Sequence, residues 1–108
     1  MLVLLSPTAL VSILGPASAC LAQTYPVRPI RFVVPLAPGG GADIVARTVG
    51  QKLGEALGQP VIIDNRGGGG TIIGTVAVAN APADGYTLLL GTATTHGINS
   101  SLVKDLPY

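Results

Sequence analysis

The sequence has little of what several common classes of small protein depend on. A single cysteine, Cys20, occurs among 108 residues, so no disulfide within the chain can hold the fold together. There is no tryptophan and only one phenylalanine, and six basic residues against five acidic ones leave a net charge of +1. A nucleic-acid surface usually needs a clustered basic excess and often stacking aromatic side chains, so no nucleic-acid partner is expected.

What is present describes a folded chain with an aliphatic core. Hydrophobic residues make up 48% of the sequence and charged residues 10%, which is too apolar and too weakly charged for an intrinsically disordered protein. The 15 glycines and 9 prolines fall in a few clusters without a fixed repeat, which excludes a collagen-like chain and predicts glycine-rich loops. The length fits one domain.

Residues 1–22 have the pattern of a secretory signal peptide. An apolar run over residues 1–14 is followed by Gly15-Pro16 and then by small residues, as at an A-x-A cleavage site, although no basic residue precedes the run. The run is too short to span a bilayer, which takes about 20 residues. We therefore expect export, with cleavage after Ala19 or Ala22 and residues 23–108 as the mature part.

Cys20 leaves a second possibility for the exported protein. It directly follows Ala-Ser-Ala, much as the acylated cysteine of a bacterial lipoprotein follows its own small residues. Ala17, however, stands where such signals usually have leucine. A lipid anchor on Cys20 is therefore the less favoured alternative to a free exported protein.

The mature part alternates short strands and helices. On the first helix, Val45, Val49 and Leu53 are expected to pack on the sheet, with Asp43 and Arg47 on other faces. The order β-α-β-α-β predicts an α/β fold with a parallel sheet that is buried on both faces. We expect strands at residues 30–36, 61–64 and 87–90, and helices at residues 42–57, 72–81 and 99–103.

Each predicted strand leads into a loop rich in glycine or threonine, at residues 38–41, 66–71 and 92–97. The carboxyl ends of parallel strands lie at one edge of the sheet, and open α/β sheets bind ligands outside that edge. Such loops offer backbone N–H groups, hydroxyls and helix N-termini to an anion without a cationic side chain. For a single loop, the simpler interpretation is that the glycines only turn the chain. Three loops at one edge favour a binding site.

No arrangement of residues indicates catalysis, and we expect neither an enzyme nor a cofactor. His96 is the only histidine and has no companions for a metal site. Asp64 ends the second strand, as the ribose-binding acid of a dinucleotide site would. A G-x-G-x-x-G pattern, however, puts Ile44, Ile72 or Ile73 at its third glycine, so a dinucleotide-binding enzyme is the weaker alternative.

The mature part also carries a series of motifs in a fixed order. They read Tyr25-Pro-Val-Arg-Pro-Ile-Arg-Phe-Val-Val-Pro35, Ala37-Pro-Gly-Gly-Gly-Ala-Asp-Ile-Val-Ala-Arg47, Leu57-Gly-Gln-Pro-Val61 with Asp64-Asn-Arg66, Ala81-Pro-Ala-Asp-Gly-Tyr-Thr-Leu88, Gly91-Thr-Ala-Thr-Thr-His-Gly-Ile-Asn99 and Leu106-Pro-Tyr108. In this order they resemble the Bug family, the extracytoplasmic substrate-binding receptors of tripartite tricarboxylate transporters. Any one motif is weak, but the ordered series is specific.

The resemblance implies a periplasmic-binding-protein-like fold of type II, in which two lobes close on a small di- or tricarboxylate or a related organic acid. Such a receptor is periplasmic, is expected to be monomeric when full length, and delivers its ligand to the membrane permease subunits. Members of the family hold the carboxylate through backbone groups, hydroxyls and ordered water. Carried over onto this chain, the ligand-binding residues are Ala37, Pro38, Gly39 and Gly40 in the first loop, Gly68, Gly69 and Gly70 in the second, and Thr92, Thr95 and His96 in the third.

Two departures from the family pattern bear on these expectations. The second loop of the family usually reads Pro-Gly-Ala-Gly-Gly-Asn, where this chain has Gly67-Gly68-Gly69-Gly70-Thr71-Ile72, so that an isoleucine replaces a polar side chain. Family members also continue well past the position of Tyr108. The resemblance therefore implies that residues 23–108 are the N-terminal part of lobe one, incomplete and without the second lobe. A non-functional product of a truncated gene is the alternative.

Overall fold

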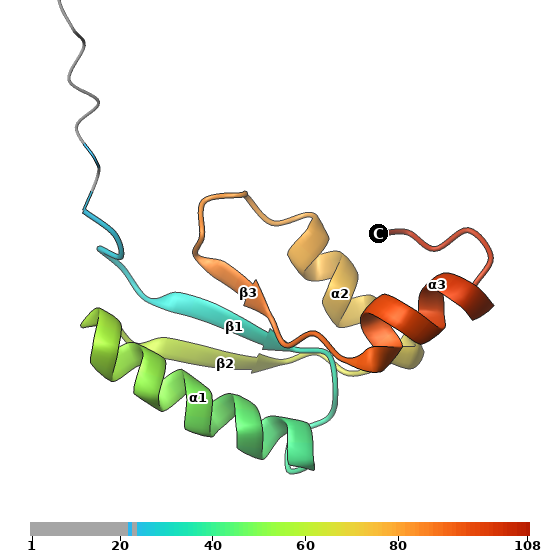
Figure 1. The fold of residues 1–108 in the computed structure, drawn as a ribbon, viewed down its shortest axis with the longest axis horizontal. Coiled ribbons are helices and arrows are strands. Elements are labelled where there is room, and N and C mark those ends of the chain that lie inside the picture. The colour runs from blue at the N-terminus through green and yellow to red at the C-terminus, as the bar shows by residue number, and fades with distance from the viewer. Residues whose placement is uncertain (1–21, 23) are drawn as a thin grey trace, which may run out of the picture.

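The structure, a computed structural model, describes residue 22 and residues 24–108. The expected signal peptide and Cys20 lie outside these residues. The described part contains a 3-stranded parallel sheet in the order β2-β1-β3, with a helix after each strand along the chain (Figure 1). The elements are β1 (Ile30–Val34), α1 (Gly41–Leu57), β2 (Val61–Asn65), a 3₁₀ turn (Gly69–Thr71), α2 (Ile72–Ala79), β3 (Thr87–Leu89), a π-helical turn (Thr94–Ile98) and α3 (Asn99–Leu102).

The expected β-α-β-α-β order and parallel sheet are confirmed, with small differences at the ends of elements. The first strand stops at Val34 because the next residue, Pro35, has no N–H to donate to a ladder. The largest difference lies in the third loop, where residues 94–98 form a π-helical turn that runs directly into α3. Within residues 24–108, no helix is long and apolar enough to cross a membrane.

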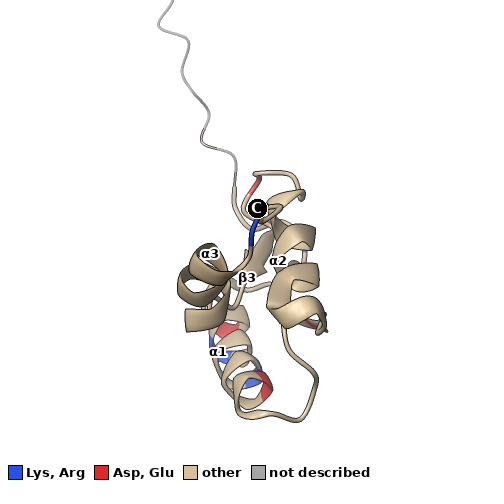
Figure 2. Ribbon diagram, turned by 90° about the vertical axis from the view of Figure 1, so that its right-hand side faces the viewer, with Lys and Arg blue, Asp and Glu red and all other residues tan. Residues whose placement is uncertain are grey.

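The two crossover helices cover opposite faces of the sheet. Side chains alternate along β1, and Phe32 and Val34 pack with Ala46 of α1. On the other face, α2 approaches Pro35 so closely that a Cβ on Gly74 would lie 2.8 Å from the Cα of Pro35. Figures 1 and 2 show α1 on one side of the strands and α2 on the other. All three strand ends consequently remain open at one edge.

The face of α1 that packs on the sheet differs from the expected one. Val45 and Val49 are 52% and 48% exposed, whereas Asp43, Ala46 and Gly50 are buried. Small residues let this helix lie very near the sheet, since a Cβ on Gly50 would meet the Cδ1 of Ile63 at 3.0 Å. The expectation that Val45 and Val49 form the inner face, with Asp43 elsewhere, is wrong because close approach of the backbones outweighed side-chain hydrophobicity.

Candidate functional site

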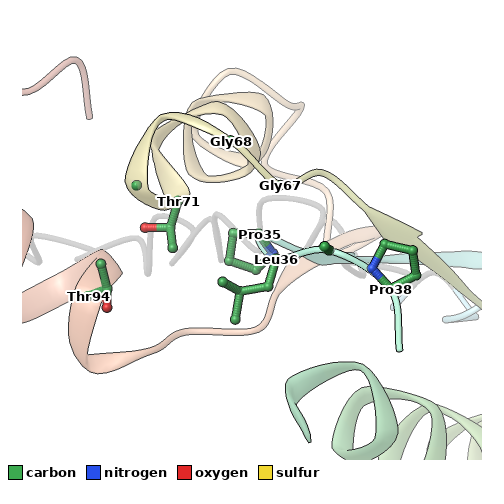
Figure 3. Close-up of a pocket in the computed structure, with 9 residues that line it drawn as sticks. Pro35, Leu36, Pro38, Gly67, Gly68, Thr71 and Thr94 are labelled. Atoms are coloured by element: carbon green, nitrogen blue, oxygen red, sulfur yellow. The ribbon is translucent and has the colours of Figure 1, made fainter. Parts of the chain in front are cut away.

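A pocket of about 620 Å³ opens at the edge where the three strands end. Its lining comes from the chain after β1, the chain after β2 and the turn after β3, and none of the lining residues carries a charge. Helices α2 and α3 beside it also have no charged residue (Figure 2). The lining residues are Pro35, Leu36, Ala37, Pro38, Gly67, Gly68, Gly70, Thr71 and Thr94 (Figure 3).

The first loop is hydrogen bonded to the carboxylate of Asp43, a residue of α1 that is only 5% exposed. The Gly39 N–H and the Arg47 Nε each donate a hydrogen bond to its Oδ2 at 3.0 Å. The Nδ2 of Asn65 donates to Oδ1 at 3.0 Å and also lies 3.4 Å from the carbonyl oxygen of Leu36. Asp43 thereby ties the loop after β1 to the end of β2.

These hydrogen bonds change the acidity of Asp43 and the role of its loop. The hydrogen bond from Arg47, followed by those from Gly39 and Asn65, lowers the pKa of Asp43 from 3.8 to about 2. Of the four residues expected to bind ligand here, Ala37 and Pro38 line the pocket, but Gly39 and Gly40 do not. The N–H of Gly39 is already used by Asp43, so in this conformation it is not free for a ligand.

The second loop requires a backbone that glycine adopts most easily. Gly68, Gly69 and Gly70 have φ values of 119°, 57° and 60°, all in the left-handed region. Gly68 and Gly70 line the pocket, while Gly69 does not. A Cβ on Gly67 would lie 3.1 Å from the backbone nitrogen of Ala37, which shows how closely the first and second loops meet.

In the third loop, the residues expected to bind ligand instead close the start of a helical turn. The Thr92 N–H donates to the Thr95 hydroxyl at 2.8 Å, and the Thr95 N–H donates to the Thr92 hydroxyl at 3.2 Å. The Thr95 hydroxyl also lies 2.7 Å from the Nδ1 of His96. Thr92, Thr95 and His96 do not line the pocket, whereas Thr94 does. Each hydroxyl of Thr92 and Thr95 thus accepts a hydrogen bond from the backbone N–H of the other threonine, in the reciprocal manner of a capping box.

Asn99, at the start of α3, joins the second and third loops. This side chain is 5% exposed, and its Nδ2 donates to the carbonyl oxygen of Gly70 at 2.9 Å. The same nitrogen lies 3.2 Å from the Thr71 hydroxyl and 3.0 Å from the Tyr108 hydroxyl, which donates to the carbonyl oxygen of Thr95 at 2.8 Å. Sequence reasoning gave Asn99 no role, because nothing local to it indicates contacts with residues about 30 positions away.

The carboxylate of Asp64, which stands where the ribose-binding acid of a dinucleotide site would, is hydrogen bonded to two arginines. Arg31 and Arg66 donate to its Oδ2 at 2.7 and 2.9 Å. Burial raises the pKa of Asp64, but the hydrogen bonds from Arg31 and Arg66 outweigh that effect, so its pKa is lowered overall. Asp64 does not line the pocket. Within the described residues, no group of three or more His, Cys, Asp and Glu side chains is placed to hold a metal ion.

Comparison with known proteins identifies the family. The sequence model of the family described as "tripartite tricarboxylate transporter family receptor" matches residues 45–108. The chain belongs to this receptor family. Protein BugT of Bordetella pertussis is 46% identical over 95 residues, which cover 87% of this chain and 29% of BugT. The resemblance of the ordered motifs to the Bug family is thereby confirmed.

Solved structures of relatives agree with the fold of this receptor chain. MatC from Rhodopseudomonas palustris with bound malate superposes with a TM-score of 0.75 and 42% identity over 78% of this chain and 29% of MatC. A second R. palustris protein, with adipate, gives a TM-score of 0.62 and 43% identity over 64% of this chain and 23% of its own. The chain thus spans less than a third of the length of these relatives. The expected periplasmic-binding-protein-like fold is confirmed for the part that is present.

Proposed function

We propose that this chain supplies one wall of the ligand site of an extracytoplasmic receptor, which binds a small carboxylate and delivers it to the permease of a tripartite tricarboxylate transporter. The observation that carries the proposal is the uncharged pocket at the carboxyl ends of the three strands. Malate in MatC and adipate in the second relative support a carboxylate ligand. The residues proposed to contact it are those that line the pocket.

An uncharged lining suits a receptor that must both bind and release an anion. Backbone N–H groups and the hydroxyls of Thr71 and Thr94 can donate hydrogen bonds to a carboxylate, and bonds to a charged acceptor are about twice as strong as neutral ones. No lining side chain is a nucleophile with an adjacent base or a titratable acid. These groups favour binding over chemical conversion.

We also propose that residues 24–108 belong to the first lobe of a two-lobed protein. A site for a small molecule usually buries about 70–90% of its ligand, and a pocket at one edge of a sheet covers a ligand from one side only. A second lobe would supply the opposite wall and remove the remaining water. The alternative is a truncated, non-functional product that lacks this second wall. The following experiment distinguishes the two.

The test is calorimetric titration of the complete product of the gene with malate, adipate and citrate, and with the diamide of malic acid as an uncharged control. We expect saturable binding of at least one acid and none of the diamide. Because no titratable side chain of residues 24–108 lines the pocket, this wall should add no pH dependence of its own, and affinity should fall as the carboxylates of the ligand take up protons. Failure to bind any carboxylate would favour the non-functional product.

A chimera gives a second measurement. In it, residues 24–108 replace the matching segment of MatC, which supplies the remainder of a malate receptor of known structure. Retention of malate binding by a folded chimera supports the proposed wall. A folded chimera that binds no carboxylate would contradict it.

A further inference from the structure

Thr71 has a backbone conformation that its residue type avoids. Its φ is 76°, and a β-branched residue in the left-handed region is an outlier. The three residues before it have positive φ as well, but each of them is a glycine, for which this conformation carries no steric penalty. The side chain of Thr71 is also buried, with 5% of the residue exposed. Strained residues of this kind persist where the surrounding structure fixes them, often at ligand sites.

The contacts of Thr71 fix its side chain and leave one hydrogen unused. The Asn99 Nδ2 lies 3.2 Å from the Thr71 hydroxyl oxygen, and this amide nitrogen, whose orientation is set by the carbonyl of Gly70, can only donate. The hydroxyl hydrogen of Thr71 therefore does not go to Asn99, and residues 24–108 provide no other acceptor for it. The Thr75 hydroxyl holds the backbone from the other side, by donating to the carbonyl of Thr71 at 2.8 Å.

Thr71 also borders the pocket. It lines the cavity together with Thr94, and Figure 3 shows the two threonines on the same side of the pocket, away from Pro38. A buried hydroxyl that accepts a hydrogen bond from a fixed amide, and has a hydrogen left to donate, suits an acceptor that arrives from the pocket.

From this arrangement we infer that the hydroxyl of Thr71 donates a hydrogen bond to a carboxylate oxygen of the ligand, and that Asn99 orients it for this contact. The inference rests on the proposed function and specifies which hydroxyl of the pocket contacts the ligand and which side chain orients it. A glycine at position 71 would adopt the same conformation without strain, but it would offer no hydroxyl to the ligand.

The experiment compares three substitutions at Thr71 in the complete product of the gene, with the carboxylate that binds best in the panel above. Thr71→Val keeps the shape and the β-branch but removes the hydroxyl, and Thr71→Gly removes both the hydroxyl and the strain. Loss of one hydrogen bond to a charged group should weaken both variants about ten- to a hundredfold. Thr71→Ser restores the donor and should recover most of the affinity.

Two controls separate a lost contact from a damaged fold. Thr48→Val removes an exposed hydroxyl on α1, which donates to the carbonyl of Ile44, and should leave the affinity unchanged. Melting temperatures without ligand show whether each variant is folded, and Thr71→Gly remains informative if Thr71→Val unfolds. Wild-type affinity in a folded Thr71→Val or Thr71→Gly would overturn the role of Thr71 while leaving the proposed function intact. A wild-type protein that binds no carboxylate would overturn both.

Discussion

At the scale of single residues, Asp43 shows how one buried carboxylate organises a loop that it does not belong to. Its charge is stabilised by Arg47, Gly39 and Asn65, so the folded protein holds Asp43 ionised more strongly than the unfolded chain does. The pKa is lowered from 3.8 to about 2 by folding. A group of this kind stabilises the fold above its unfolded pKa, and that stabilisation is lost as the pH falls through the folded pKa.

We therefore expect Asp43→Asn to remove a stabilisation that is present at neutral pH. The difference in unfolding free energy between wild type and Asp43→Asn should be constant above about pH 5 and shrink as the pH falls from about 4 to about 2. Denaturant unfolding of the complete product of the gene across this pH range measures the difference, and NMR titration of the Asp43 carboxyl carbon reports its pKa directly. A carboxyl that titrates near its ordinary value of 3.8 would show that the network does not hold in solution.

Gly74 tests a close contact between α2 and the end of β1. A Cβ at this position would lie 2.7 Å from the carbonyl oxygen of Arg66 and 2.8 Å from the Cα of Pro35, and both of these are backbone atoms that cannot move aside cheaply. Gly74→Ala should destabilise the fold by about 1–3 kcal/mol. Gly97→Ala is the matched control, because nothing lies within 4 Å of its Cβ. Equal melting temperatures of the two variants would contradict the packing of α2 on Pro35.

At the scale of elements, α1 shows which part of the fold could be predicted from the sequence. The limits of α1 followed to within one residue from the run Gly39-Gly40-Gly41 at its start and from Gly58 after its end. Gly58 has the left-handed conformation of a helix C-cap, with φ 71°. The rotation of the helix could not be predicted in the same way. The hydrophobic pattern selects Val45 and Val49, whereas Ala46 and Gly50 face the sheet, because their small size allows close approach.

The inner face of α1 can be tested by adding volume to it. Ala46 is fully buried against Phe32 and Val34, so Ala46→Leu should force these side chains apart and cost about 1–3 kcal/mol of unfolding free energy. Val49→Ala, on the exposed face of the same helix, should change the stability by less than about 0.5 kcal/mol. Thermal or denaturant unfolding of both variants, made in the complete product of the gene, measures these differences in stability. The reverse ranking would restore the face that the hydrophobic pattern selects.

The loops divide in a similar way between what was predictable and what was not. The predicted order of strands and crossover helices correctly placed three loops at one edge of the sheet, because the carboxyl ends of parallel strands all lie at the same edge. The contributions of individual residues depend on hydrogen bonds that no spacing reveals. Thr92 and Thr95 bond to each other, the Gly39 N–H bonds to Asp43, and Thr94 and Thr71 line the pocket instead.

At the scale of the whole molecule, the core is concentrated in one strand. The buried hydrophobic residues are Ile30, Phe32, Val33 and Val34 of β1 together with Ala46 of α1. β1 is hydrogen bonded on both sides, whereas β2 and β3 are each paired on one side only within the described residues. Ile62 of β2 remains 54% exposed. A sheet with two unpaired edges and exposed aliphatic side chains buries little surface, so we expect its free energy of unfolding to be small.

We accordingly expect residues 24–108, produced alone, to be at most marginally folded. A domain of this size buries only about 60–65% of the surface that its unfolded chain exposes, and here the burial centres on β1. Heating should give a broad transition by circular dichroism, and hydrogen exchange should protect the amides of β1 more than those of β2 or β3, because only β1 is paired on both sides. The proposed two-lobed receptor, measured in parallel, should melt cooperatively, since its proposed remainder would pair the open edges and cover Ile62. A sharp, concentration-independent transition in monomeric residues 24–108 would show instead that this three-stranded unit is stable by itself.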